Sequence, residues 1–276
     1  MTNLKKVLDY AVCKNIGIIG FVVHGWEDAR AFVKAGIDVS EPIVIQAGPL
    51  CRRHTPLTVL GKMFRCLAEE SNQDVVLHLD HATDIKTCKT ALDEGFTSIM
   101  YDGSRLKLSD NIKNTIKISK LVEPYNASLE AELGYVGYTG GEQCTPTNAC
   151  DVKTFLSETD IDALAVSVGN THLQENSKAK IDYLNLKRIR KITSIPLVVH
   201  GASGISRSDR KKMFTSHGVK KFNIGTELRR AFGKSIRNTL KKNIDEYDRL
   251  KIFQAVEKDL QAVATVLLTE ISQKQM

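Results

Sequence analysis

Three histidines in this sequence are placed where they could bind one metal ion. His81, His172 and His200 each follow or end a short apolar run, which is the expected pattern of a buried strand. If these runs are parallel strands of one barrel, the three side chains lie on the face where barrel enzymes hold their active sites. Neutral imidazole suits Zn²⁺, and three His ligands with an open fourth position are typical of a catalytic site. The pattern therefore predicts such a site, with the Asp80 carboxylate directly beside its first ligand.

Asp80 and His81 are adjacent in the sequence, which restricts the backbone conformation that would bring both side chains to one site. Successive residues of a strand point to opposite faces of the sheet. Both side chains can reach one site only if the strand has already ended and the pair lies in the following loop. We therefore expect a strand over residues 75–79, followed directly by a loop.

Two glycine-containing segments predict a phosphate site. The sequence HGASG occupies residues 200–204 and NIGT occupies residues 223–226. In barrels of this kind a phosphate site often forms from the loops after the seventh and eighth strands. Glycines let backbone N–H groups approach an anion, and the hydroxyls of Ser203 and Thr226 are further donors.

Eight apolar runs alternate with helix-length amphipathic segments and would hold these residues in place. Such alternation indicates parallel βαβ units, and eight repeats favour an α/β fold of the closed (β/α)8, or TIM, barrel type over an open sheet. About 250 residues are typical of that barrel, so we expect residues 1–276 to form a single domain, with extra C-terminal helices over 227–273. The expected strands are 16–23, 42–48, 75–79, 97–101, 127–133, 163–169, 195–201 and 219–225.

The composition argues against several classes of protein. Hydrophobic residues make up 42% and charged residues 26% of the chain, and no run approaches the roughly 18 apolar residues of a membrane span. The N-terminus lacks the apolar region of a signal peptide and the six cysteines contain no CxxC pair, so a reducing cytoplasm is expected. The net charge of +7 is spread along the chain, which favours solvated helix faces over a nucleic-acid surface. A bias toward anionic small substrates is the weaker alternative.

The motifs occur in an order that resembles one enzyme family. They are HLDH (78–81), DGS (102–104), EAELG (130–134), ALAVSVGNTH (163–172), HGASGI (200–205) and NIGTELR (223–229). Their order and spacing, between about residues 4 and 245, resemble the class II aldolases, specifically the fructose- and tagatose-bisphosphate aldolases. The resemblance implies zinc-dependent, reversible aldol cleavage of a ketose phosphate to dihydroxyacetone phosphate and an aldehyde. A monovalent cation is a further expected ligand, and the expected assembly is a homodimer or homotetramer.

Residue by residue, the resemblance implies roles for the reacting groups. His81, His172 and His200 would be the zinc ligands. Asp80 would be the acid/base that handles the C4-hydroxyl proton, and Glu142 is the best match to a loop glutamate that deprotonates the ketone phosphate. No Schiff-base lysine is then required. The two lysines of the eighth run, at positions 220 and 221, are expected on its solvated or helix-facing sides.

The remaining matched residues would bind the metal at a second position or bind the substrate. Asp102 and Glu132 match positions near an alternative metal site. Arg52 is of interest because guanidinium matches the geometry of anionic groups, although a solvated helix flank explains it equally well. The candidates for substrate or phosphate binding are Gln46, Arg52, Gly201, Ser203, Asn223 and Thr226.

Two positions depart from the family pattern. Val22 stands where the family has Asn at the end of the first strand. Leu173 replaces the Gly that follows the metal-binding His and that contacts phosphate and a monovalent cation. An intact zinc site with a changed periphery suggests the same reaction on a different substrate. Two alternatives stay open: a non-catalytic or divergent sugar-phosphate-binding barrel, and a zinc hydrolase, although the first strand lacks the HxH that a hydrolase usually has.

Overall fold

A closed barrel of parallel strands forms the centre of the molecule. The computed structural model describes residues 1–174 and 179–273. Within them, eight strands pair in sequence order, and the last pairs with the first. This confirms the α/β, (β/α)8 prediction. The strands are β1 (Ile18–Val22), β2 (Ile43–Ala47), β3 (Val75–Ala82), β4 (Ser98–Tyr101), β5 (Ser128–Leu133), β6 (Ala163–Val166), β7 (Leu197–Val199) and β8 (Val219–Ile224).

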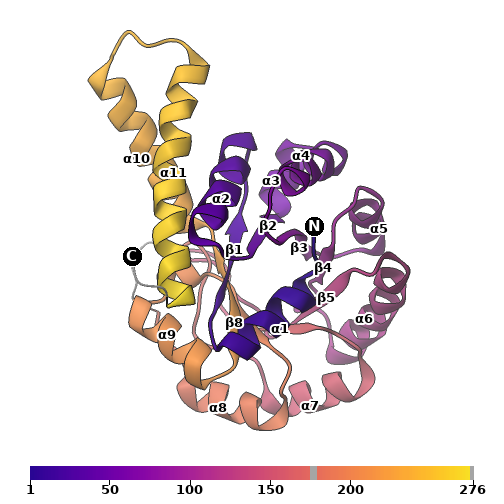
Figure 1. The fold of residues 1–276 in the computed structure, drawn as a ribbon. Coiled ribbons are helices and arrows are strands. Elements are labelled where there is room, and N and C mark those ends of the chain that lie inside the picture. Colours follow the sequence, from indigo (N-terminus) through magenta and orange to yellow (C-terminus); the bar gives the residue numbers. More distant parts are fainter. Residues whose placement is uncertain (175–178, 274–276) are drawn as a thin grey trace.

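Helices surround the strands as an outer layer (Figure 1). Their apolar faces pack on the outward-facing side chains of the strands, for example Phe32 of α2 on Phe21 of β1 with ring centroids 4.8 Å apart. The helices are α1 (Leu4–Lys14), α2 (Trp26–Val39), α3 (Pro49–His54), α4 (Leu57–Glu69), α5 (Ile85–Asp93), α6 (Leu108–Val122), α7 (Ala149–Glu158), α8 (Tyr183–Ile192), α9 (Arg207–Ser216), α10 (Thr226–Lys242) and α11 (Arg249–Ser272), with short 3₁₀ turns at Glu123–Tyr125 and Ala202–Gly204.

The first helix, α1, closes the amino end of the barrel. Leu4, Val7, Leu8 and Ala11 recur at helical spacing, and all four side chains are buried. They pack against residues near the starts of the strands, including Ile18. Figure 1 shows this helix, in indigo, lying across the barrel. The opposite end, where the strands finish, is therefore the one that is left for a ligand.

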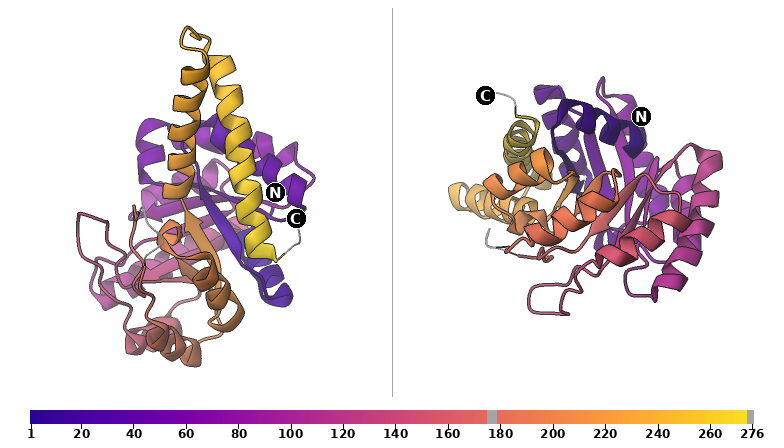
Figure 2. Two further views of the ribbon diagram at one scale, coloured as in Figure 1. Left: turned by 90° about the vertical axis from the view of Figure 1, so that its left-hand side faces the viewer. Right: turned by 90° about the horizontal axis from the view of Figure 1, so that it is seen from below.

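The extra C-terminal helices, α10 and α11, form a hairpin that projects beyond the barrel (Figures 1 and 2). Charged side chains link α11 of this hairpin to α2. Glu257 of α11 accepts hydrogen bonds from Arg30 Nε and Lys34 Nζ, each at 2.8 Å. In the part of the chain that the structure describes, no helix is both long and apolar enough to cross a membrane.

Candidate metal centre and active-site mouth

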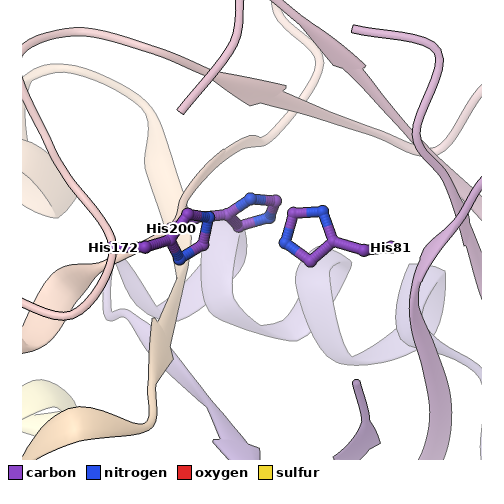
Figure 3. Close-up of side chains that lie close together, drawn as sticks. All are labelled: His81, His172 and His200. Carbon is purple, nitrogen blue, oxygen red and sulfur yellow. The ribbon is translucent and has the colours of Figure 1, made fainter. Parts of the chain in front are cut away.

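The three predicted histidines converge at the carboxyl end of the barrel. His81 comes from β3, His172 from the loop after β6, and His200 follows β7. Their ring centroids are 4.6–5.8 Å apart, and one ligand atom from each lies within 4.8 Å of the others. Figure 3 shows the three imidazoles turned toward one another. Strands far apart in the sequence thus bring three metal-binding nitrogens to one point.

Asp80 and His81 both face this point, but not for the reason expected from the sequence. The prediction that β3 ends before the pair was wrong, because the strand continues to Ala82. Instead, its pairing with β4 shifts register between Leu79 and Ala82, and His81 adopts a left-handed backbone with φ of 51°. A bulge of this kind breaks the alternation of side chains and re-aims one of them. The conformation costs about 1–3 kcal/mol in a non-glycine residue, which is characteristic of functional sites.

Carboxylates orient two of the imidazoles. His81 Nδ1 lies 2.7 Å from Asp102 Oδ2, and His200 Nε2 lies 3.2 Å from Glu130 Oε1. Metal-binding histidines usually hold a carboxylate through the second ring nitrogen in this way. His200 Nδ1 is buried and has no hydrogen-bond partner among the described residues. One nitrogen of each ring is therefore left for a metal.

The charges around the imidazoles also suit a cation. Of the described residues, four buried or mostly buried carboxyl groups border the site, and Lys221 is the one ammonium ion in contact with any of them. The four are Asp80, Asp102, Glu130 and Glu132. Burial alone would lower the pKa of His200, but Glu132 and Glu130 together raise it to about 10. An excess of buried negative charge is stabilised by a divalent ion. The donor set therefore fits Zn²⁺, which prefers imidazole nitrogen.

A second group of possible ligands overlaps the first. His81, Asp102 and Glu132 also place one ligand atom each within 4.8 Å of one another. Glu132 Oε2 is buried, 3.4 Å from His200 Nδ1, and has no hydrogen-bond donor among the residues described. Asp102 and Glu132 are the two carboxylates that the family resemblance places near an alternative metal site.

Asp80 is held by two amides. Its Oδ2 accepts from Gln46 Nε2 and its Oδ1 from Asn223 Nδ2, both at 3.2 Å. The two amides fit beside each other because β1 has Gly20 there; a Cβ at this glycine would come within 2.3 Å of the Gln46 amide oxygen. Burial alone would raise the pKa of Asp80, but the charges of His81 and its neighbours outweigh burial and lower it. The carboxyl group is thus kept ionised.

A buried polar cluster fills the barrel beneath the site. Lys221 is fully buried inside the barrel, so the prediction of a solvated or helix-facing side chain was wrong for it. Its Nζ donates to Glu130 Oε2 at 2.9 Å and lies 3.3 Å from His78 Nε2. Burial and the adjacent ammonium of Lys221 lower the pKa of His78 to about 3, so this imidazole is neutral. Lys220 does face the helices, where it donates to the Phe214 carbonyl oxygen at 2.9 Å.

The two loops predicted to bind phosphate lie side by side at the mouth. Gly201 has φ of 62°, and a Cβ there would come within 2.3 Å of the Thr171 carbonyl oxygen, so only glycine fits. Ser203 Oγ accepts from the backbone N–H of Glu227 at 3.1 Å, which ties the loop after β7 to the first turn of α10. Gly201, Ser203, Asn223 and Thr226 all line one cavity with the zinc-ligand candidates His81 and His172.

That cavity, of about 270 Å³, includes residues that the sequence did not point to. Tyr138, in the loop after β5, stacks on His172 with ring centroids 4.9 Å apart. Arg229 also lines the cavity, and its Nη2 donates to Thr226 Oγ1 at 3.3 Å. Arg229 follows Thr226 by three residues at the start of a helix, a spacing that could have revealed it. No pattern in the sequence singled out Tyr138.

Six of the predicted site residues do not line this cavity, namely Gln46, Arg52, Asp102, Glu132, Glu142 and His200. Arg52 points into the backbone instead, and its Nη atoms donate to the carbonyl oxygens of Ala47 at 2.9 Å and His81 at 3.1 Å, as well as to that of Asp80. It therefore supports the end of β3, whereas its neighbour Arg53 lines the cavity. Glu142 is exposed and paired with Arg105. Its catalytic role and a substrate role for Arg52 stay predictions.

Leu173 keeps the backbone conformation that glycine would adopt. It stands directly after His172 with φ of 59° and is 40% exposed. The left-handed conformation costs a non-glycine residue about 1–2 kcal/mol. A glycine would adopt this backbone without that cost, and the leucine side chain instead adds to the cavity wall.

The left-handed backbone of Leu173 predicts a measurable effect on stability. Leu173→Gly should raise the free energy of unfolding by about 1 kcal/mol, because relief of the left-handed leucine exceeds the entropy that glycine gives to the unfolded chain. Chemical denaturation measures the difference. Leu184→Gly is the control, since Leu184 is an exposed residue of α8 and its replacement should cost about 1 kcal/mol. A loss of stability in Leu173→Gly equal to that of the control would contradict the argument.

Comparisons with known proteins agree with this site and fold. A model of the family "fructose-bisphosphate aldolase class-II" matches residues 2–275. The sequence is 29% identical over 259 residues to the fructose-bisphosphate aldolase of Geobacillus stearothermophilus, covering 91% of this chain and 90% of that protein. The structure is similar to the YdjI aldolase from Escherichia coli K12, with a TM-score of 0.84 and 27% identity over 98% of this chain and 96% of that one.

A further solved structure shows the same fold at lower identity. The fructose-bisphosphate aldolase of Campylobacter jejuni has a TM-score of 0.83 and 23% identity, covering 97% of this chain and 93% of that one. The family match extends over nearly the whole chain and supports an aldolase, and so a lyase, activity. Sequence and structure together therefore show that this chain belongs to the class II fructose-bisphosphate aldolase family.

Proposed function

We propose that this protein is a zinc-dependent aldolase that reversibly cleaves a phosphorylated ketose to dihydroxyacetone phosphate and an aldehyde. The observation that carries the proposal is the convergence of His81, His172 and His200 beside Asp80, at the edge of a cavity that the two phosphate-type loops also line. When bound by these imidazoles, zinc would supply Lewis-acid stabilisation of the negative charge that develops on the ketone oxygen.

Asp80 would move the proton of the reaction. In the cleavage direction its carboxylate accepts the C4-hydroxyl proton while the C3–C4 bond breaks and the aldehyde carbonyl forms. The electron pair of that bond stays on the ketone phosphate, whose C3 carbon is then protonated, a step that the family resemblance gives to Glu142. The amides of Gln46 and Asn223 hold the Asp80 carboxylate in place. Gln46 and Asn223 would thus affect the reaction indirectly, by orienting the carboxylate of Asp80.

The cavity also carries positive charge suited to a phosphorylated substrate. Ser203 and Thr226 offer hydroxyls, and the first turn of α10 begins at Thr226. Helix amino ends attract anions. Arg53 and Arg229 line the same cavity and raise the local concentration of an anionic substrate. The partners that we propose are small-molecule ketose phosphates, and we propose that the protein binds neither nucleic acid nor a membrane. The proposed location is the cytoplasm.

Metal analysis combined with a cleavage assay tests the proposal. The purified protein should contain about one zinc ion per chain, bound by the imidazoles of His81, His172 and His200. It should cleave at least one member of a panel of ketose phosphates, and a chelator should stop the cleavage. Bound zinc without any cleavage would favour a hydrolase or a sugar-phosphate-binding barrel. Neither zinc nor cleavage would overturn the proposal.

We further propose that the helical hairpin contacts a second copy of the chain. Ile244, Tyr247 and Leu250 lie at its tip and are 82%, 94% and 69% exposed. Their apolar surface would be buried in a homodimer or homotetramer. The double variant Ile244→Asp/Tyr247→Asp should therefore dissociate the oligomer in size-exclusion chromatography with light scattering. Leu184→Asp, at an exposed position on α8, is the control that should leave the mass unchanged. An unchanged mass in the double variant would exclude the hairpin tip as the interface.

A further inference from the structure

A second cavity opens beside the first and has a different character. Its volume is about 240 Å³, and it lies where the end of β1 meets α2, α10 and α11. We call it the side chamber. Phe32, Leu228 and Leu260 form part of its wall and are at most 3% exposed. The apolar side chains around the chamber are Val22, Phe32, Leu228, Phe232 and Leu260.

The side chamber adjoins the active-site cavity. Val22, His24 and Arg229 line both spaces, so the two cavities meet at these three side chains. Val22 is the position at which the chain departs from the asparagine of its family. The border between the two cavities is therefore apolar at a place where a polar side chain was expected.

The interior of the chamber suits an uncharged ligand. Burial and the Arg229 charge lower the pKa of His24 to about 4, so its imidazole is neutral near pH 7. Asp28 accepts a hydrogen bond from the His24 backbone N–H at 2.9 Å, and the remaining wall is hydrocarbon. An apolar cavity of about 150 Å³ is enough to bind benzene. The side chamber exceeds that size, so a phenyl group or a short alkyl chain fits it.

The position of the chamber indicates which part of a substrate would enter it. The loops after β7 and β8 offer the phosphate-binding groups, and the three imidazoles lie on β3 and after β6 and β7. The rest of the active-site cavity is lined by residues that follow β1 and β2, including His24, Pro49 and Leu50. The aldehyde must occupy that part, because the ketone phosphate fills the other. The side chamber leads away from it at Val22 and His24.

We propose that the side chamber binds an apolar substituent of the aldehyde, which makes this aldolase selective for aldehydes with an alkyl or phenyl group beyond the carbonyl. This inference rests on the proposed function, because it assumes that dihydroxyacetone phosphate occupies the phosphate loops. Leu228 and Leu260 are then specificity-determining residues. Both line the side chamber and neither lines the active-site cavity.

Condensation of dihydroxyacetone phosphate with acetaldehyde, propanal, butanal, pentanal and phenylacetaldehyde tests the proposal. In the wild-type protein kcat/KM for the aldehyde should rise roughly fourfold for each added methylene, the usual gain on burying such a group. Leu260→Phe fills part of the chamber and should reduce this rise for the longer aldehydes while leaving acetaldehyde unaffected. Val266→Phe, at an exposed position of the same helix away from the hairpin tip, is the matched control and should retain the rise. Leu228→Phe is a second chamber-filling variant if the first folds poorly.

Binding of toluene, followed by ligand-observed NMR, tests the chamber independently of catalysis. The wild-type protein and Val266→Phe should bind toluene, and Leu260→Phe should bind it more weakly. Activity with acetaldehyde but no dependence on chain length would overturn the inference and leave the proposed function standing. Equal toluene binding in the wild-type protein and Leu260→Phe would overturn it as well. A lack of condensation with every aldehyde would overturn the proposed function. It would also overturn the aldehyde as the ligand of the side chamber, whether or not toluene binds there.

Discussion

Asp80→Asn is expected to lower kcat for aldol cleavage by about 10²–10⁴-fold, which is the usual contribution of a general acid/base. The amide has the shape of the carboxylate but cannot accept the hydroxyl proton. It also fits the site, because the buried amide oxygens of Gln46 and Asn223 have no partner among the described residues and can turn toward the new NH₂ group. Metal content should stay at the wild-type level, since we propose Asp80 as a base and not as a ligand. Steady-state kinetics and elemental analysis of the same sample measure both quantities.

His81→Ala is the comparison that separates the two roles. This variant loses an imidazole of the proposed zinc site and should lose metal and activity together. Asp80→Ala should resemble Asp80→Asn in keeping its metal, although it removes the acceptor of two buried amide donors. Loss of metal from Asp80→Asn in proportion to its loss of activity would contradict this division of roles.

Lys221→Met is expected to lower the free energy of unfolding by about 3–5 kcal/mol, the cost of breaking a buried ion pair from one side. The Lys221 ammonium is the fully buried partner of the Glu130 carboxylate at 2.9 Å. Its removal leaves that carboxylate in the barrel interior with the His200 imidazole and the neutral His78 as neighbours. Urea denaturation measures the loss.

The adjacent lysine provides a matched control. Lys220 is also almost fully buried, but its Nζ donates to neutral oxygens of Asn15 and Phe214. Lys220→Met should therefore cost less, about 1–2 kcal/mol. Adding Glu130→Leu to Lys221→Met should restore part of the stability, because replacing both members of a buried pair is often neutral. Equal losses at positions 220 and 221 would show that burial, and not the ion pair, determines the effect.

The fold and the three-histidine site could be predicted because both follow from position along the chain. Each strand is a short apolar run, and the carboxyl ends of parallel strands in a barrel meet on one face. His81, His172 and His200 could therefore be brought together without knowledge of any contact. The same logic placed the loops after β7 and β8 at this face, and both line the cavity; phosphate binding by them stays a prediction.

Features that depend on local backbone geometry could not be predicted. Nothing in the sequence HLDH marks the bulge that turns both Asp80 and His81 to the mouth, because the left-handed residue there is not a glycine. Alternation along β8 places one of two adjacent lysines inside the barrel, but its partner Glu130 is 91 residues away. The inward turn of Arg52 likewise depends on how closely α3 follows β2, which spacing alone does not give.

The helix that closes the amino end of the barrel has a consequence for how this enzyme could diverge. The α1 side chains Leu4, Val7 and Leu8 are buried against the strand starts, at the opposite end of the barrel from the loops that line the cavity. Substitutions at the mouth, such as Val22 and Leu173, therefore leave the hydrophobic seal intact. The packing that maintains the fold lies at the starts of the strands, whereas the loops that would determine the substrate follow their ends. Selection can therefore change the loops without disturbing that packing. A lineage with this arrangement can acquire new substrates by altering its loops while keeping the packing of α1 against the strand starts.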